Sequence, residues 1–147
     1  MKTFSLDENE QREHFAWFTT IPTRWNDNDQ YGHVNNVVYY NFFELAIMKY
    51  LVEASGLDVV KGSSLAFTAE NGCRYHRSVQ FPQVVDCGLR VVKIGNSSVR
   101  YELGVFVQGD EKAAATGFVV DVFVDSKTEL PISIPVDIKQ ALQRLIV

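Results

Sequence analysis

The sequence predicts an α+β domain in which an antiparallel five-stranded sheet wraps around one long buried helix. Two observations support this prediction. A single strand-like segment precedes one long apolar helical segment, and four strand-like segments separated by turn signals follow it. The chain contains no internal repeat and no linker, so residues 1–147 are expected to form one domain. That length is sufficient to bury a core without disulfides or metals.

The first expected strand covers residues 14–25, which are rich in aromatic and branched side chains and include Pro22 at an edge or a bulge. The helix is expected from 36 to 54, with Gly56 ending it. Apolar residues recur there at helical spacing, at Phe43, Ile47, Tyr50, Leu51 and Ala54. Other apolar residues cover much of the remaining helix surface, which is typical of a helix enclosed by a sheet or placed at an interface.

The remaining strands are expected at about residues 65–81, 84–95, 97–108 and 113–124. Gly95-Asn96 and Gly109-Asp110 are turn signals that predict antiparallel hairpins. The core of the domain therefore spans about 14–125, and a short C-terminal helix is expected at 135–145.

The composition is that of an average soluble globular protein, with 46% hydrophobic and 22% charged residues. A net charge of -4 without a Lys/Arg cluster argues against nucleic acid as a partner. No apolar run approaches the roughly 18 residues of a membrane span. The N-terminal segment MKTFSLDENEQREH lacks the apolar core of a secretion signal. A cytoplasmic protein is therefore expected, with Cys73 and Cys87 as free thiols.

The segment 26–36, NDNDQYGHVNN, is the part of the chain that is richest in chemically active side chains. Asp27, Asp29 and Gly32 match positions one, three and six of an EF-hand calcium loop. Tyr31 and Val38, however, occupy positions five and twelve, which require oxygen ligands, so a calcium loop is disfavoured. The chain also lacks GxSxG, HExxH, P-loop and GxGxxG motifs.

The same segment can form an active site at the start of the expected helix. Asn35 is a favoured N-cap residue, and the first turn of a helix leaves backbone N–H groups unpaired and partly positive. Such groups stabilise a carbonyl oxygen that becomes negative during acyl transfer. Gly32 lets the chain bend so that the Asp29 carboxylate and the Asn36 amide face one substrate carbonyl.

Residues 24–39, RWNDNDQYGHVNNVVY, together with Phe43-Glu44, resemble the D-x-D-x-x-G-H-V-N-N-x-x-Y pattern of hotdog-fold thioesterases of the 4-hydroxybenzoyl-CoA thioesterase type. The resemblance implies a hotdog fold and hydrolysis of acyl-CoA to a free acid and CoA. It implies that Asp29 is the nucleophile or the general base and that the Asn36 backbone amide is the oxyanion donor. No cofactor and no metal are implied.

The resemblance also implies a homodimer or homotetramer with sites between subunits. The expected substrate-binding residues beside Asn36 are Gly32, His33, Asn35 and Tyr39. His33 could bind substrate, orient Asp29 or pack at a subunit boundary, and the sequence leaves these roles open. Asp27 is expected to be structural, bonding loop amides or Arg24.

Two other functions remain open. One is a non-catalytic hotdog protein that binds acyl-CoA or lipid, and the other is a hotdog hydratase or dehydratase. The carrier is open as well, since Tyr31 stands where acyl-ACP thioesterases have a catalytic Asn. Acyl length, and aromatic against aliphatic preference, are not readable from the sequence.

Overall fold

The computed structural model describes residues 5–147, so residues 1–4 of the polar N-terminal segment lie outside it. Its principal elements are β1 (Trp17–Pro22), α1 (Val38–Ser55), β2 (Ser64–Tyr75), β3 (Val84–Ile94), β4 (Ser98–Val107), β5 (Ala115–Asp125) and α2 (Val136–Gln143). The predicted order of one strand, one long helix and four strands is confirmed. The first strand and β2 are shorter than expected, since β2 ends at Tyr75 and not near residue 81.

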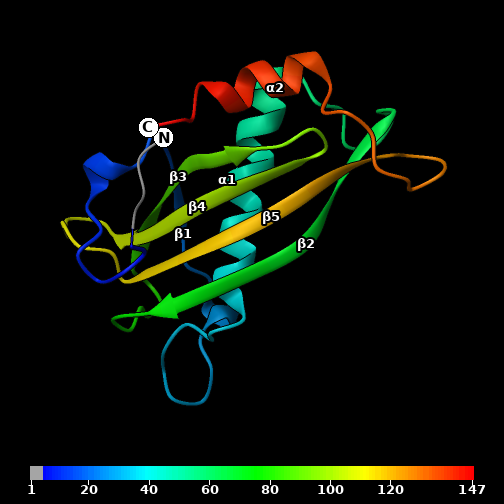
Figure 1. Ribbon diagram of the computed structural model, residues 1–147. Helices are drawn as coiled ribbons and strands as arrows, with labels where there is room; N and C mark the ends of the chain where they lie inside the picture. Colours follow the sequence, from blue (N-terminus) through cyan, green and yellow to red (C-terminus); the bar gives the residue numbers. More distant parts are fainter. Residues whose placement is uncertain (1–4) are drawn as a thin grey trace.

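The five strands form one antiparallel sheet in the order β1-β3-β4-β5-β2 (Figure 1). Both predicted hairpins are present, because β3 pairs with β4 across the Gly95 turn and β4 pairs with β5 across the Gly109 turn. Pro22 ends β1, which is an edge strand as expected. Strand β2 is the other edge, and its register with β5 shifts between Thr68 and Glu70.

Helix α1 crosses one face of the sheet, called here the inner face (Figure 1). Its side chains Phe43, Ile47 and Leu51 have no exposed surface. The sheet accepts the helix closely at β5, where a Cβ on Gly117 would overlap the ring of Phe43. A sheet curved around one helix in this strand order is the hotdog fold, which the sequence predicted.

The sheet covers only one side of α1. Leu45 and Val52 keep 40% and 43% of their surface exposed, and both are apolar. The prediction of a helix apolar on many sides is thus correct, but the described residues of a single chain do not enclose it. The uncovered side is a candidate interface.

Helix α2 packs against the C-terminal half of α1 and closes that end of the core (Figure 1). The Tyr50 hydroxyl donates a hydrogen bond of 2.6 Å to the carbonyl of Ala141, which joins the two helices. The backbone N–H of Val91 on β3 donates to the Leu145 carbonyl. The predicted C-terminal helix at 135–145 is therefore present. Within residues 5–147, no helix is both long and apolar enough to cross a membrane.

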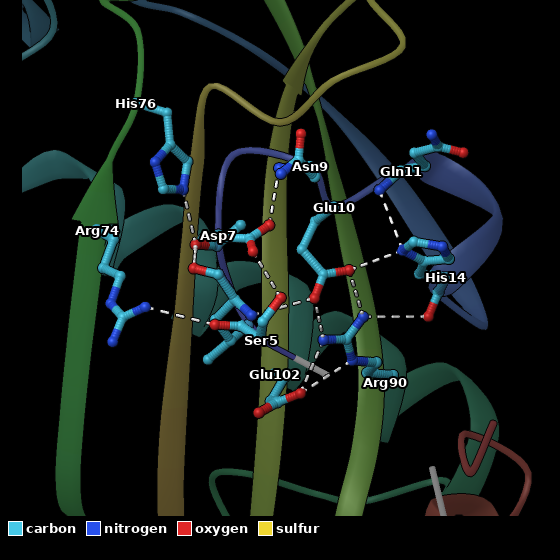
Figure 2. A network of polar contacts seen from close by, with 12 residues as sticks. Ser5, Asp7, Asn9, Glu10, Gln11, His14, Arg74, His76, Arg90 and Glu102 are labelled. Carbon is cyan, nitrogen blue, oxygen red and sulfur yellow. Dashed lines mark hydrogen bonds and ion pairs between the residues drawn. The ribbon is translucent and has the colours of Figure 1, made fainter. Parts of the chain in front are cut away.

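Residues 5–14 lie over the opposite, outer face of the sheet, and we call them the N-terminal strap. A fully buried arginine holds the strap in place (Figure 2). Arg90 on β3 donates to Glu10 of the strap at 2.8 Å and to Glu102 on β4 at 2.8 Å. Its side chain also reaches the His14 carbonyl. This network was not predicted from the sequence, because its charged residues come from three distant segments.

Candidate functional site at the start of α1

The loop before α1 is anchored by Asp27, whose side chain is 2% exposed. Its Oδ2 accepts the backbone N–H of Arg24 at 2.7 Å, and its Oδ1 accepts the Arg24 guanidinium at 2.9 and 3.1 Å. Its own carbonyl accepts the N–H of Asn35. Asp27 is therefore structural, as the sequence predicted, and it ties the two ends of the loop together.

A tight turn holds Asp29 at the tip of this loop. The N–H of Gly32 donates to the Asp29 carbonyl at 3.1 Å, and the N–H of Asp29 donates to the His33 carbonyl at 2.9 Å. Gly32 has φ +79°, a conformation that favours glycine. The Asp29 Oδ1 accepts the Tyr31 N–H, whereas within residues 5–147 its Oδ2 accepts no hydrogen bond. One carboxylate oxygen thus remains available to a substrate or a water.

The start of α1 differs from the prediction. The helix begins at Val38 with Val37 in the N-cap position, so Asn35 is not the N-cap and Asn36 precedes the helix. Asn35 instead forms a turn one step earlier, because its Oδ1 accepts the N–H of Val37 and its carbonyl accepts the N–H of Val38. Among the described residues, nothing accepts a hydrogen bond from the Asn36 N–H.

Asn36 lines a cavity of about 300 Å³ beside the start of α1. The loop before α1 and the end of β2 meet there (Figure 1). The cavity brings together three of the predicted site residues, His33, Asn36 and Tyr39. The other three, Asp29, Gly32 and Asn35, do not line it in the single chain.

The end of β2 and the residues just after it contribute side chains to this cavity that were not predicted from the sequence. Tyr75 donates its hydroxyl to the Asn36 carbonyl at 2.9 Å, and its ring meets that of Tyr39 edge to face at 5.1 Å. His76 and Arg77 follow, and both line the cavity. The register of β2 against β5 brings these side chains to the cavity, and the sequence alone does not predict that register. Cys73 and Cys87 are free thiols, as predicted.

Three of the side chains that line the cavity, Tyr39, Tyr75 and His76, stay uncharged at neutral pH. Burial raises the pKa of Tyr39 to about 12 and also raises the pKa of Tyr75, so both hydroxyls remain protonated donors. Burial lowers the pKa of His76, against the opposing effect of Glu8 and Asp7. His76 is therefore a neutral imidazole at neutral pH, able to accept or donate one proton.

The five-stranded antiparallel sheet and the long helix α1 packed against it define a hotdog-fold protein. Residues 23–142 match the Thioesterase-like superfamily, and the chain belongs to that family.

The chain is also similar to individual proteins from several organisms. It is 46% identical to the PA5185 protein from Pseudomonas aeruginosa strain PAO1, with a TM-score of 0.92, and the match covers 92% of this chain and 95% of that one. It is 31% identical to a thioesterase from Thermus thermophilus whose structure contains coenzyme A and Zn, with a TM-score of 0.75, covering 90% and 96%. It is 26% identical to the uncharacterized protein YsmA of Bacillus subtilis (strain 168), covering 84% and 83%.

Proposed function

We propose that this protein hydrolyses acyl-CoA thioesters to a free acid and CoA. The observation that carries the proposal is the Asn36 backbone N–H, which has no acceptor within residues 5–147 and lies at a cavity beside the start of α1. An unpaired N–H at that place can receive the oxygen of a thioester carbonyl and stabilise it as it becomes an oxyanion. The similarity to a CoA-containing thioesterase supports CoA as the carrier.

Asp29 supplies the carboxylate in this mechanism from the turn beside the cavity, where its N–H donates to the carbonyl of the lining residue His33. Its free Oδ2 either attacks the carbonyl carbon to give a mixed anhydride, which water then hydrolyses, or removes a proton from the attacking water. In both routes the CoA thiolate leaves and takes up a proton. Gly32 and Asn35 hold the loop through the hydrogen bonds of its turn, while His33 and Tyr39 contact the substrate in the cavity.

A second copy of the chain completes the proposed enzyme as a homodimer or homotetramer. Two observations support this assembly. The outer edge of β2 pairs with no other strand among the described residues, and such a long edge is a template for pairing with another chain. The apolar side chains of Leu45 and Val52 remain exposed on α1. Light scattering during size-exclusion chromatography will measure the number of copies.

The activity test is thiol release from a broad panel of acyl-CoA esters. The wild-type protein is expected to release CoA, and Asp29→Asn is expected to lower kcat by about a hundredfold or more, the usual contribution of a general base. Asp110→Asn is the matched control, because Asp110 is an exposed carboxylate in the turn between β4 and β5. Wild-type turnover by Asp29→Asn on every accepted ester would show that the assignment of Asp29 is wrong. Binding without release, or hydration of an enoyl ester without release, would overturn the hydrolase proposal itself.

Labelled water separates the two roles of Asp29. In a single turnover in H₂¹⁸O, attack by the carboxylate leaves one labelled oxygen in Asp29, whereas general-base catalysis places the label only in the product acid. Mass spectrometry of the peptide that contains residues 26–36 reads this difference directly.

A further inference from the structure

A second cavity, with a volume of about 410 Å³, lies on the outer face. Strap residues Ser5 and Leu6 form one wall. Strands β2, β4 and β5 form the others through Arg74, Arg100 and Phe118, respectively. This volume is within the range of small-molecule sites. Because the family match begins at residue 23, the strap wall belongs to a part of the chain outside the matched region.

Two arginines, Arg74 and Arg100, give this cavity positive charge and N–H donors. The Arg100 guanidinium lies 4.1 Å from the centre of the Phe118 ring, and within residues 5–147 it makes no hydrogen bond or ion pair. Its N–H groups are therefore available to a ligand. Arg74 donates one long hydrogen bond of 3.4 Å to the Ser5 carbonyl and no other among the described residues (Figure 2). A guanidinium recognises phosphate through paired N–H donors, and a stacked guanidinium also presents a flat surface to a planar ring.

The acidic lining residue does not cancel this charge. Glu102 directs Oε1 to the buried Arg90, which donates to it at 2.8 and 3.0 Å (Figure 2). Arg90 is shared with Glu10, so it offsets the negative charge of Glu102 only in part, but Arg74 and Arg100 still outnumber this one acidic lining residue. Thr116 also lines the cavity, and its hydroxyl donates to the Leu6 carbonyl at 2.6 Å, which holds the strap wall.

One hydrogen bond joins this cavity to the candidate active site. His76 lines the cavity at the start of α1, and its Nε2 lies 2.9 Å from the Oγ1 of Thr116, which lines the outer cavity. The linings of the two cavities therefore adjoin around the end of β2, where Arg74 lines the outer cavity and Tyr75 lines the cavity at the start of α1.

From these contacts we propose that the outer cavity binds a phosphorylated nucleotide. Arg74 and Arg100 hold the phosphate groups, and the Arg100–Phe118 pair carries the planar base. The nucleotide has two possible sources, the carrier end of the thioester substrate or a free nucleotide, and the first of these rests on the function proposed above. The binding itself does not depend on catalysis.

The direct test is calorimetric titration of the full-length protein with adenosine 3′,5′-bisphosphate. Saturable binding is expected, and Arg74→Gln and Arg100→Gln should each weaken it about tenfold or more, consistent with the loss of one charge-assisted contact. Phe118→Leu should also weaken it, since the ring supports Arg100. Lys127→Gln is the control, because it removes one positive charge from the turn after β5, outside the cavity. No saturable binding, or equal affinity in the arginine variants and the control, would overturn the proposal.

Kinetics then identify the source of the nucleotide. If it is the carrier end of the substrate, Arg100→Gln raises KM about tenfold or more for an acyl-CoA but leaves KM unchanged for the same acyl group on pantetheine. If it is a free nucleotide, added adenosine 3′,5′-bisphosphate changes the rate with acyl-pantetheine in the wild type and not in Arg100→Gln. Both results support the cavity as a nucleotide site. A protein that hydrolyses no thioester but binds the nucleotide through these arginines would refute only the proposed function.

Discussion

Tyr75 at the end of β2 donates its hydroxyl to the backbone carbonyl of Asn36, 39 residues earlier in the chain, at 2.9 Å. This bond fixes the residue whose N–H is the proposed oxyanion donor to an edge strand of the sheet. The position of the donor therefore depends on the sheet as well as on the loop before α1.

Tyr75→Phe should lower kcat by about tenfold, because a small displacement of a catalytic group is costly. The unfolding free energy should fall by only about 1 kcal/mol, the usual contribution of one hydrogen bond. Steady-state kinetics and urea unfolding measure the two effects. Tyr31→Phe removes the same hydroxyl from a side chain that is 87% exposed and should change neither. Equal kcat in both variants would show that the Asn36 carbonyl needs no support from β2.

Arg90→Met should destabilise the protein by about 3–5 kcal/mol, because it leaves the buried carboxylates of Glu10 and Glu102 without their cation. Glu10→Gln combined with Glu102→Gln in the same background should restore part of the loss. Urea unfolding at pH 7 measures each variant. Recovery in the triple variant distinguishes unpaired charge from lost packing, since packing alone would not return when the carboxylates are neutralised.

The same network predicts acid sensitivity. Burial raises the pKa of Glu10, but hydrogen bonds from Arg90 and His14 outweigh it and hold the pKa below the ordinary value of 4.5. A lowered folded-state pKa means that the stabilisation is present above the unfolded pKa and is lost as pH falls through the folded one. Unfolding free energy should therefore drop below about pH 4.5 in the wild type. Glu10→Gln should show a smaller drop over the same window.

Asp121 on β5 is expected to give the opposite dependence of the unfolding free energy on pH. Its side chain is fully buried, its Oδ1 accepts the Thr68 hydroxyl, and its Oδ2 has no partner within residues 5–147. Burial raises its pKa above the ordinary value of 3.8, and the Thr68 hydrogen bond only partly opposes this. When the pKa is higher in the folded state, stability is greatest at a pH below the pKa of the unfolded state. That stability is lost as the pH rises through the pKa of the folded state.

Asp121→Asn should therefore be more stable than the wild type at pH 8 and equal to it near pH 4. Glu44 on α1 titrates beside it, since burial and then Asp121 raise the Glu44 pKa, so a weaker pH dependence should remain in the variant. Tyr101 also lies near Asp121, and its hydroxyl stays protonated because burial raises the pKa of Tyr101. Urea unfolding at the two pH values tests the prediction, with the exposed Glu111→Gln as control. A variant less stable than the wild type at pH 8 would contradict it.

The fold was predictable from the sequence because its signals are local. Helical spacing at Phe43, Ile47 and Leu51 and the two Gly turns depend on neighbouring residues only. Asp27 was also assigned correctly, because its partner Arg24 is three residues away. The end of β2 and the role of Asn35 were not predicted correctly. Each depends on which nearby acceptor a backbone N–H group uses, as when Val37 and Val38 donate to Asn35.

The contacts that position the candidate site were harder to predict because they join distant segments. Tyr75 reaches Asn36 and His76 reaches Thr116 only through the register of β2 against β5. Likewise, Glu10 meets Arg90 across 80 residues of sequence. A strand that slips by one residue turns every side chain to the other face, so such contacts require the register itself.

Gly117 shows how much of this geometry depends on a single missing atom. Its absent side chain leaves a depression in β5 that is occupied by Phe43, and a Cβ there would also crowd the carbonyl of Gly72 on β2. The helix can therefore lie close to the sheet only because residue 117 is glycine. Because Phe43 follows Asn36 by only seven residues, a methyl group at residue 117 would disturb the same stretch of α1 that begins beside the candidate site.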